Sequence, residues 1–291
     1  MNAPRLVAVG DNCLDAYLTR NQVTVGGNAL NVAVQWQRNG WTARYFGAVG
    51  ADPEGDLVCE AVAATGLDPA DVERRSGETA VTLLSDRAGD RHFLLEAFGV
   101  GTHYMPSPER YAAAAAADWV HLGTNASPEL VRRLVADRVP FSVDLSTAPF
   151  ALPLAGVPMV FASGPSAPGE PVASLIAALR RAGAGTVVLT CGRRGAYFDD
   201  GRVHAFAPAT QVEVVDTCGA GDSFIATFIT AFCCQHLPAG DALARASAAA
   251  AQTCTHLGGF PQPSHPIPDW LPVKYAAVIA GEPAPGVKNG G

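Results

Sequence analysis

Lysine is nearly absent from this sequence. The 291 residues contain only Lys274 and Lys288, both close to the end of the chain, and the formal net charge is −7. Nucleic-acid binding needs a basic patch, because most of its affinity comes from phosphate contacts. No cluster of lysine and arginine supplies one, so we expect no nucleic-acid partner. Positive charge at a bound phosphate would have to come from arginine, backbone N–H groups or a metal ion.

Long apolar runs and paired cysteines are also missing. No uninterrupted apolar stretch reaches the roughly 18 residues of a membrane span. The segment Met1 to Arg5 lacks a charged region followed by a long apolar stretch, so it is unlike a signal peptide. The seven cysteines are odd in number and have no paired spacing, which indicates neither a disulfide framework nor a zinc site. We therefore expect a cytoplasmic protein without a membrane partner.

Short apolar segments alternate with helical patterns along most of the chain. This alternation is typical of an α/β protein with a central, mostly parallel sheet and helices on both faces. Two further strand-like segments flank a polar turn and predict a hairpin, which suggests a small sheet projecting from the main domain. The expected strands are 6–10, 43–49, 119–123, 141–145, 157–162 and 186–190, the hairpin strands are 79–84 and 92–97, and the clearest helices are 53–65, 128–137 and 239–252.

A glycine-rich turn, Asp216 to Asp222, contains the strongest functional signal. It follows the apolar run Val212–Val215, which we interpret as a strand, and precedes the apolar helical run Ser223–Phe232. Small residues at a helix start let a ligand approach N–H groups that have no partner in the helix, and such a site binds phosphate. A carboxylate beside it could take the proton of an attacking alcohol. Tight packing with a favourable helix-dipole charge is the alternative interpretation.

A second candidate site follows the first strand. Asp11 and Asp15 come after residues 6–10, and ligands of α/β sheets collect where strands end. Asp11 could instead cap a turn. The sequence Gly26-Gly27-Asn28 signals a turn, and Asn28 or Asn31 could cap the helix that runs to Asn39.

Two segments together resemble the ribokinase-like (PfkB) sugar kinases. One is Asp216-Thr217-Cys218-Gly219-Ala220-Gly221-Asp222-Ser223-Phe224, and the other, about 190 residues earlier, is Gly26-Gly27-Asn28-Ala29-Leu30-Asn31-Val32-Ala33 followed by Gly40 and Gly50. The resemblance implies a three-layer α/β/α fold with a small β-sheet lid. It implies a kinase domain over residues 1–260, lid strands within about 15–26 and 78–98, and a Pro/Gly-rich tail over 261–291.

The resemblance also implies roles for single residues in ATP-dependent phosphorylation of a sugar hydroxyl. Asp222 would be the general base and Gly219, Ala220 and Gly221 the anion hole. The acceptor would be held by Asp15, Gly27 and Asn31, with Asp11 and Asn28 as further candidates. The nucleotide would be held by Thr190, Gly192, Gly195, Cys218 and Gln252, with Arg193 or Arg194 as added charge. A homodimer through the lid is a further implication.

Two segments depart from the family pattern. Ser163-Gly164-Pro165-Ser166 stands where many relatives have Asn-x-x-Glu, which organises magnesium, so the Mg²⁺ expected with ATP has no assigned ligands. Asp144-Leu145-Ser146-Thr147-Ala148 lacks the arginine of the usual Asp-x-Asn-x-Arg. A monovalent cation such as K⁺ near Asp216 is also implied.

Within the family, residues 10–17 and 26–34 are most similar to kinases that phosphorylate fructoselysine on its 6-hydroxyl. Glu96, in the lid, is then a candidate partner for the ammonium group of the amino-acid part. The alternatives are another sugar or nucleoside, such as fructose, ribose or adenosine, and a sugar- or nucleotide-binding regulator without turnover. A dinucleotide-dependent oxidoreductase is excluded, because no Gly-x-Gly-x-x-Gly follows the first strand.

Overall fold

The main sheet of the molecule is built from strands that run mostly in one direction. The structure is a computed structural model that describes residues 3–87, 90–167, 169–263 and 265–281. In these ranges the main sheet has nine strands in the order β13-β12-β11-β10-β9-β8-β1-β4-β5. Neighbours from β11 to β5 are parallel, whereas β12 and β13 are antiparallel. The bounds are β1 Arg5–Val9, β4 Thr42–Gly50, β5 Val72–Arg75, β8 Trp119–Leu122, β9 Phe141–Asp144, β10 Met159–Ser163, β11 Thr186–Thr190, β12 Ala196–Asp199 and β13 His204–Ala207.

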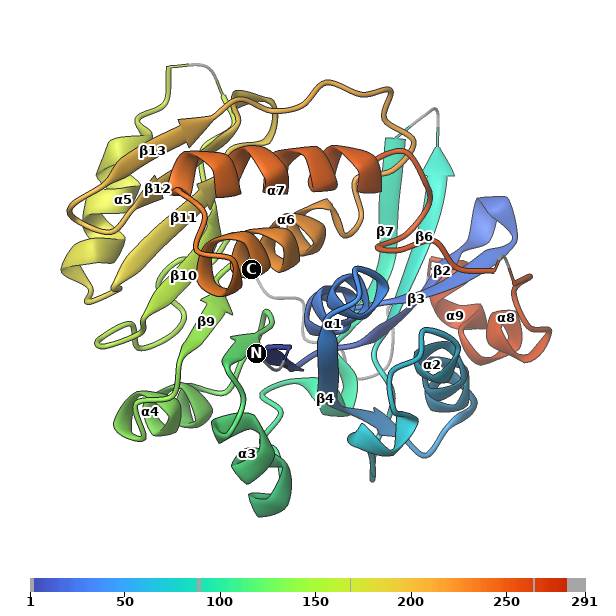
Figure 1. The fold of residues 1–291 in the computed structure, drawn as a ribbon. Coiled ribbons are helices and arrows are strands. Elements are labelled where there is room, and N and C mark those ends of the chain that lie inside the picture. The colour runs from blue at the N-terminus through green and yellow to red at the C-terminus, as the bar shows by residue number, and fades with distance from the viewer. Residues whose placement is uncertain (1–2, 88–89, 168, 264, 282–291) are drawn as a thin grey trace.

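Helices cover both faces of this sheet, which confirms the three-layer fold (Figure 1). Successive side chains of a strand point to opposite faces, so the fully apolar β1 feeds two cores. Leu6 and Ala8 belong to the core under one helical layer, and Val7 and Val9 to the core under the other. The first layer is α1 Asn28–Arg38, α2 Pro53–Ala64, α6 Ala220–Ile229 and α7 Ala239–Thr253, and the second is α3 Pro108–Ala115, α4 Pro128–Ala136 and α5 Val172–Arg181.

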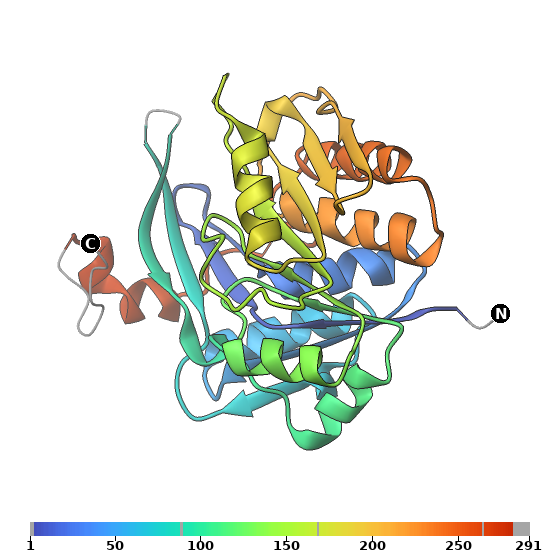
Figure 2. The ribbon, with the colours of Figure 1, turned by 90° about the vertical axis from the view of Figure 1, so that its left-hand side faces the viewer.

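A separate four-stranded sheet forms the expected lid, with the order β3-β2-β6-β7. Figure 2 shows it standing beside the main sheet. Its strands are β2 Cys13–Tyr17, β3 Gln22–Gly26, β6 Val81–Arg87 and β7 Asp90–Ala97. The chain leaves the main sheet after β1, makes two lid strands, and returns at the start of α1. The beginning of α1 therefore lies at the junction of the two sheets.

Two segments differ from the sequence-based expectation. The apolar run Val212–Val215 is not a strand of either sheet, and Val214 and Val215 are 51% and 53% exposed. The chain also stays folded beyond residue 260, with α8 Trp270–Lys274 and α9 Ala276–Ile279. Its prolines interrupt any long periodic pattern, and short helices of this kind give little sequence signal.

The residues after 260 are attached to the rest of the molecule. His265 bridges Val23 on the edge strand of the lid, and Leu271 is fully buried. The Lys274 ammonium lies 2.6 Å from Glu54 Oε1 on α2, and the Tyr275 hydroxyl donates to the same oxygen at 2.9 Å. Residues 261–281 are therefore not a loose tail as far as they are described, and 282–291 lie outside the described residues. No helix in the described part of the chain is long and apolar enough to cross a membrane.

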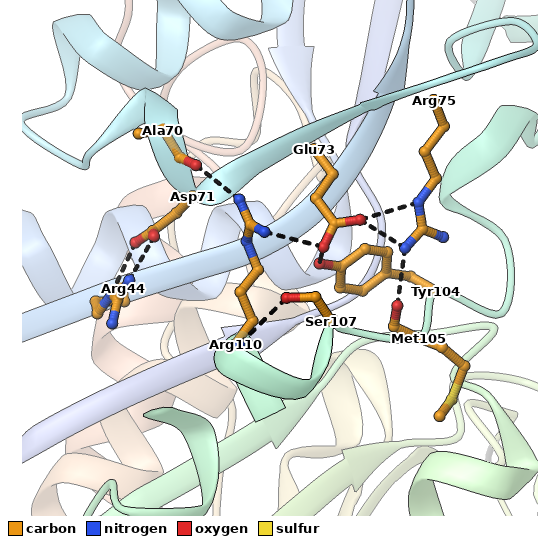
Figure 3. A network of polar contacts seen from close by, with 9 residues as sticks. All are labelled: Arg44, Ala70, Asp71, Glu73, Arg75, Tyr104, Met105, Ser107 and Arg110. Carbon is orange, nitrogen blue, oxygen red and sulfur yellow. Dashed lines mark hydrogen bonds and ion pairs between the residues drawn. The ribbon is translucent and has the colours of Figure 1, made fainter. Parts of the chain in front are cut away.

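A polar network fastens the β5 edge of the main sheet to α3 (Figure 3). Glu73, on β5, accepts hydrogen bonds from the Tyr104 hydroxyl at 2.8 Å and the Arg75 guanidinium at 2.7 Å. The Arg110 guanidinium, on α3, lies 3.2 Å from the same carboxylate. Burial by itself would raise the pKa of Glu73, but the hydrogen bonds from Arg75 and Tyr104 hold that pKa below its usual value.

We expect Glu73→Gln to lower the free energy of unfolding by about 1–3 kcal/mol at pH 7, because three donors lose a charged acceptor. A lowered carboxyl pKa stabilises the fold above the unfolded pKa, and that contribution is lost as pH falls. The loss should therefore shrink at pH 4, as measured by urea unfolding. Glu60→Gln, an exposed change on α2, is the control. Equal losses at both pH values would contradict this account.

Candidate active site

The candidate site lies where the parallel strands of the main sheet end. From β1 the sheet extends through β4 to one side and through β8, β9, β10 and β11 to the other. The chain order reverses between β1 and β8, and ligands of open α/β sheets bind at such a crevice. Asp11 follows β1 and Thr124 follows β8, and the Thr124 hydroxyl lies 3.5 Å from Asp11 Oδ2. The two residues mark the crevice.

The start of α1 is fixed against this crevice by Asp11. Its two carboxylate oxygens accept the N–H groups of Asn28 at 2.9 Å and Ala29 at 3.2 Å. Gly27 precedes the helix with φ of 112°, and a Cβ there would lie 2.4 Å from the Asn12 Cα. Only glycine fits this close approach. Asp11 thus caps the helix, and Gly27 lets Asn28 point into the crevice.

The Asn28 side chain joins two carboxylates from opposite parts of the sequence. Its Nδ2 donates to Asp222 Oδ1 at 2.5 Å and to Asp144 Oδ2 at 2.9 Å. Its Oδ1 accepts the backbone N–H of Thr124 at 3.1 Å. Asp144 ends β9, and Asp222 lies in the first turn of α6. Because the two carboxylates share one donor nitrogen, they are held side by side.

Burial shifts the titration of both carboxyl groups. Asn31 Nδ2 donates to Asp222 Oδ2 at 2.6 Å, so both oxygens of Asp222 accept an amide. Burial is the main cause that raises the pKa of Asp222 to about 8, and the charges of Asp144 and Asp11 add to it against the hydrogen bonds. Burial likewise raises the pKa of Asp144 to about 6. A carboxyl group with a pKa of about 8 can exchange a proton near neutral pH, as the predicted role of Asp222 as a base requires.

A cleft of about 380 Å³ opens on the Asp144 side of this pair. Among its lining residues are the acidic groups Asp11, Asp144 and Glu96 and the amide Asn12. Sequence reasoning did not identify Asn12, and it doubted a ligand role for Asp144. The signal for Asp144 was its place at the end of a strand in a parallel sheet. The predicted acceptor residues Asp15, Gly27 and Asn31 are not among the residues that line this cleft.

These three residues lie together around the start of α1. A Cβ added to Gly26 would lie 3.3 Å from Asp15 Oδ2 and 3.5 Å from Asn31 Oδ1. Asn31 contacts Asp222 directly, and Gly27 precedes Asn28. Asn31 and Gly27 therefore help to position the carboxylate pair, Asn31 by a direct hydrogen bond and Gly27 through Asn28.

A second cleft, of about 410 Å³, opens on the other side of Asp222. Three predicted nucleotide-binding residues line it, Thr190, Gly192 and Gly195, together with Ala220 and Gly221 at the start of α6. Its far wall is apolar and includes Val212, Val214, Phe224 and Ala251. Part of the run 212–215 forms this wall, which accounts for its apolar residues. This apolar pattern is the reason why the sequence analysis predicted a strand there.

The helix start in this cleft has the properties of an anion site. Gly219 has φ of 72°, and a Cβ there would lie 2.3 Å from the Gly259 Cα. A Cβ on Gly221 would meet nothing within 4 Å, so its backbone is open. The Ala220 N–H donates to Thr217 O at 3.3 Å. Of the three predicted anion-hole residues, Gly219 and Gly221 thus have the freer N–H groups within the described chain, and first-turn N–H groups attract negative charge.

Two other predicted nucleotide residues do not line the second cleft. The Gln252 amide donates to Thr255 Oγ1 at 3.3 Å, and the Cys218 N–H donates to Asp216 Oδ1 at 3.0 Å. On α7 the cleft is lined by Ser247, Ala250 and Ala251, and Cys254, the C-cap of this helix, continues the helical spacing. Gln252 falls outside that stripe. Arg193 lines the cleft, whereas the Arg194 guanidinium donates to the carbonyls of Pro165, Ala167 and Glu170.

Asp216 connects the glycine-rich turn to the lid. It is 2% exposed, and its Oδ2 accepts the Gly258 N–H at 3.0 Å and the Tyr17 hydroxyl, from lid strand β2, at 3.3 Å. In the described residues no group of three or more His, Cys, Asp or Glu could hold a metal ion. The Mg²⁺ and K⁺ sites stay predictions, and we derive no step from a metal.

The sequence and the fold place the chain in a known class. It matches the model of the pfkB family carbohydrate kinases over residues 5–137 and 162–264, and it belongs to that family. It is therefore a phosphotransferase that acts on a sugar hydroxyl.

The relatives indicate its place within the family. The chain is 33% identical over 261 residues to fructoselysine 6-kinase of Escherichia coli K12, covering 88% of this chain and 99% of that protein. It is 30% identical over 270 residues to a fructosamine kinase of Bacillus subtilis 168, covering 88% and 93%. Its fold is similar to that of Arabidopsis thaliana ribokinase complexed with ribose and ATP, with a TM-score of 0.75, 20% identity and coverage of 89% and 94%.

The raised carboxyl pKa of Asp222 predicts how stability depends on pH without ligands. The folded state keeps a proton that the unfolded chain releases near pH 4, so stability falls as pH rises from there towards 8. Asp222→Asn removes this loss. The free energy of unfolding of this variant minus that of the wild type should therefore be about 1–3 kcal/mol larger at pH 8.5 than at pH 5.5, because one pKa unit is about 1.4 kcal/mol.

Urea unfolding at the two pH values measures this difference. Asp241→Asn, which removes an exposed carboxylate on α7, is the matched control. A pH-independent difference between Asp222→Asn and the wild type would show that Asp222 is ionised throughout.

Proposed function

We propose that this protein is an ATP-dependent fructosamine kinase whose acceptor is fructoselysine, phosphorylated at the 6-hydroxyl. The observation that carries the proposal is the position of Asp222. Its carboxylate shares the Asn28 amide with Asp144, which lines the acidic cleft, and Asp222 directly follows Gly221, which lines the cleft at the helix N-terminus. The two relatives described above, a fructoselysine 6-kinase and a fructosamine kinase, support the choice of acceptor.

Asp222 is the proposed general base. Asn28 and Asn31 each donate an amide to one of its oxygens, so the carboxylate cannot rotate away. In the ionised form it accepts the proton of the attacking hydroxyl as that oxygen bonds to phosphorus. Asn31 and Gly27, carried over from the family as acceptor residues, position this base and Asn28. Asp15 keeps the proposed contact with sugar hydroxyls.

The second cleft is the proposed nucleotide site. Its apolar wall suits a flat base, and its polar end lies at Thr190, Gly192 and Gly221. ATP, when bound, supplies the phosphoryl group. The N–H groups of Gly219 and Gly221 would then face the negative charge that develops on the transferred phosphoryl, and Arg193 adds a positive charge at the rim. The predicted contacts of Cys218 and Gln252 find no support in this geometry. Pairing of two lids stays a prediction.

The acceptor assignment is tested by ATP consumption with Mg²⁺ on fructoselysine, fructose, ribose and adenosine. We expect turnover on fructoselysine with a product phosphorylated at the 6-position, and a fall of about 10²–10⁴-fold for Asp222→Asn, the usual size of a general-base effect. Asp241→Asn is the control for a charge change outside the site. Preference for ribose or adenosine would reject the acceptor, and near wild-type turnover by Asp222→Asn would reject the base.

The pH dependence of kcat/KM for the acceptor tests the electrostatics of the base. Activity needs ionised Asp222, so kcat/KM should rise with pH to a plateau above about pH 8. Asp144→Asn removes a negative charge beside Asp222, so the rise of kcat/KM should occur at lower pH. Asn31→Leu removes a hydrogen bond that lowers the pKa of Asp222 and should move it to higher pH. Shifts in the same direction for the two variants would contradict the assignment.

A further inference from the structure

The acidic cleft carries charge of one sign. Its lining includes the carboxyl groups of Asp11, Asp144 and Glu96 and, in the described part of the chain, no lysine or arginine. The single histidine in its lining, His103, has Nδ1 3.3 Å from the Ala126 carbonyl. An anionic acceptor would meet only repulsion there, whereas a cation would be attracted. The charge of the cleft therefore favours an acceptor that carries a protonated amine.

The three carboxyl groups differ in what they can still bind. Asp11 accepts two N–H groups of α1, and its Oδ2 also accepts the Thr124 hydroxyl at 3.5 Å, so only its Oδ1 keeps a lone pair. Glu96 is exposed on the lid. Asp144 is only partly exposed and lines the cleft. Its Oδ1 accepts the Ser146 N–H at 2.8 Å and its Oδ2 accepts Asn28 at 2.9 Å, so each oxygen keeps one lone pair for a ligand.

Asn12 adds a buried amide to the lining of this cleft. It is 2% exposed and lines the cleft beside Asp11. Its Nδ2 donates to the Tyr45 hydroxyl at 2.9 Å and to the Ala48 carbonyl at 3.0 Å. Its Oδ1 is buried and has no hydrogen-bond partner in the described residues. A buried acceptor without a donor is costly, so the hydrogen bonding of this lining residue is incomplete.

We propose that Asp144 binds the secondary ammonium group on C1 of the fructosamine while Asp222 faces the 6-hydroxyl of the same molecule. This inference rests on the proposed function and assigns the residue that selects the amine. In a furanose ring the C1 and C6 arms flank the ring oxygen, so the amine and the hydroxyl lie on one edge. Asp144 and Asp222 also lie on one edge, because both accept the same Asn28 nitrogen.

The bound amine would also act on the base. The negative charge of Asp144 is one of the causes that raise the pKa of Asp222. A cation beside Asp144 offsets that charge, so the pKa of Asp222 falls when the correct acceptor is present. A neutral sugar in the same place leaves Asp222 protonated at neutral pH. Selection of the amine would therefore act on kcat as well as on KM.

The wild-type enzyme tests the proposal without any risk of misfolding. The probes are 1-deoxy-1-propylaminofructose and 1-O-propylfructose, which differ in one group at C1, a charged amine or a neutral ether oxygen. We expect kcat/KM to be at least about 30-fold higher for the amine, of the order of one charge-assisted hydrogen bond. A ratio near one overturns the role of the ammonium group. Failure of the enzyme on every fructosamine would instead reject the proposed function.

Variants then identify the carboxylate. Asp144→Asn should bring the amine-to-ether ratio close to one, while Glu96→Gln, which removes a charge from the same cleft, should keep most of it. Because both acceptors use Asp222, any general effect on the base cancels in the ratio. If Glu96→Gln lowers the ratio as much as Asp144→Asn, or if Asp144→Asn slows both acceptors equally, Asp144 is not the amine-binding residue. Unfolding midpoints of both variants show whether the fold is intact.

Discussion

The side-chain amide of Asn28 is the contact on which the rest of this site depends. Two carboxyl groups, Asp144 and Asp222, are brought to one buried edge of the sheet, where their charges repel. One amide nitrogen donates to both, which compensates part of the cost of burying them together. Burial is the main cause that raises the pKa of Asp222 to about 8, and this repulsion adds to it. The cost of burying the pair and the raised pKa are therefore two results of one arrangement.

The path of the chain explains why Asn28 can reach both partners. After β1 the chain makes two lid strands and re-enters at α1, whose first residue is Asn28. Asp11 fixes that helix start, and the close approach at Gly27 sets its direction. On the other side of the site, the Tyr17 hydroxyl on β2 reaches Asp216 before the glycine-rich turn. The lid is thus connected to the start of α1 through Gly27 and to the glycine-rich turn through Asp216. Movement of the lid would therefore change the positions of both Asn28 and the start of α6.

The two clefts have electrostatic potentials of opposite sign. The acceptor cleft is lined by acidic groups, whereas the nucleotide cleft has helix N–H groups, small residues and Arg193. A chain with only two lysines can build the second kind of site, because N–H groups at a helix start supply positive potential without a charged side chain. In the proposed assignment of the clefts, the acidic lining repels phosphate from the acceptor site. A cationic acceptor and an anionic donor would then approach Asp222 from different sides.

The sequence by itself determined the fold class, the lid, the glycine-rich helix start and Asp222, because strand and helix periods and glycine positions are local properties of the chain. It did not determine which polar residues meet. Asn28 and Asp144 are 116 residues apart, and only the order of β9, β8 and β1 in the sheet brings them into contact. Gln252 lies outside the stripe of α7 that lines the second cleft, because the rotation of α7 about its axis is set by packing and not by the sequence period. The run Val212–Val215 was predicted as a strand because an apolar cleft wall and a buried strand are both rich in valine. Only the tertiary structure distinguishes the two.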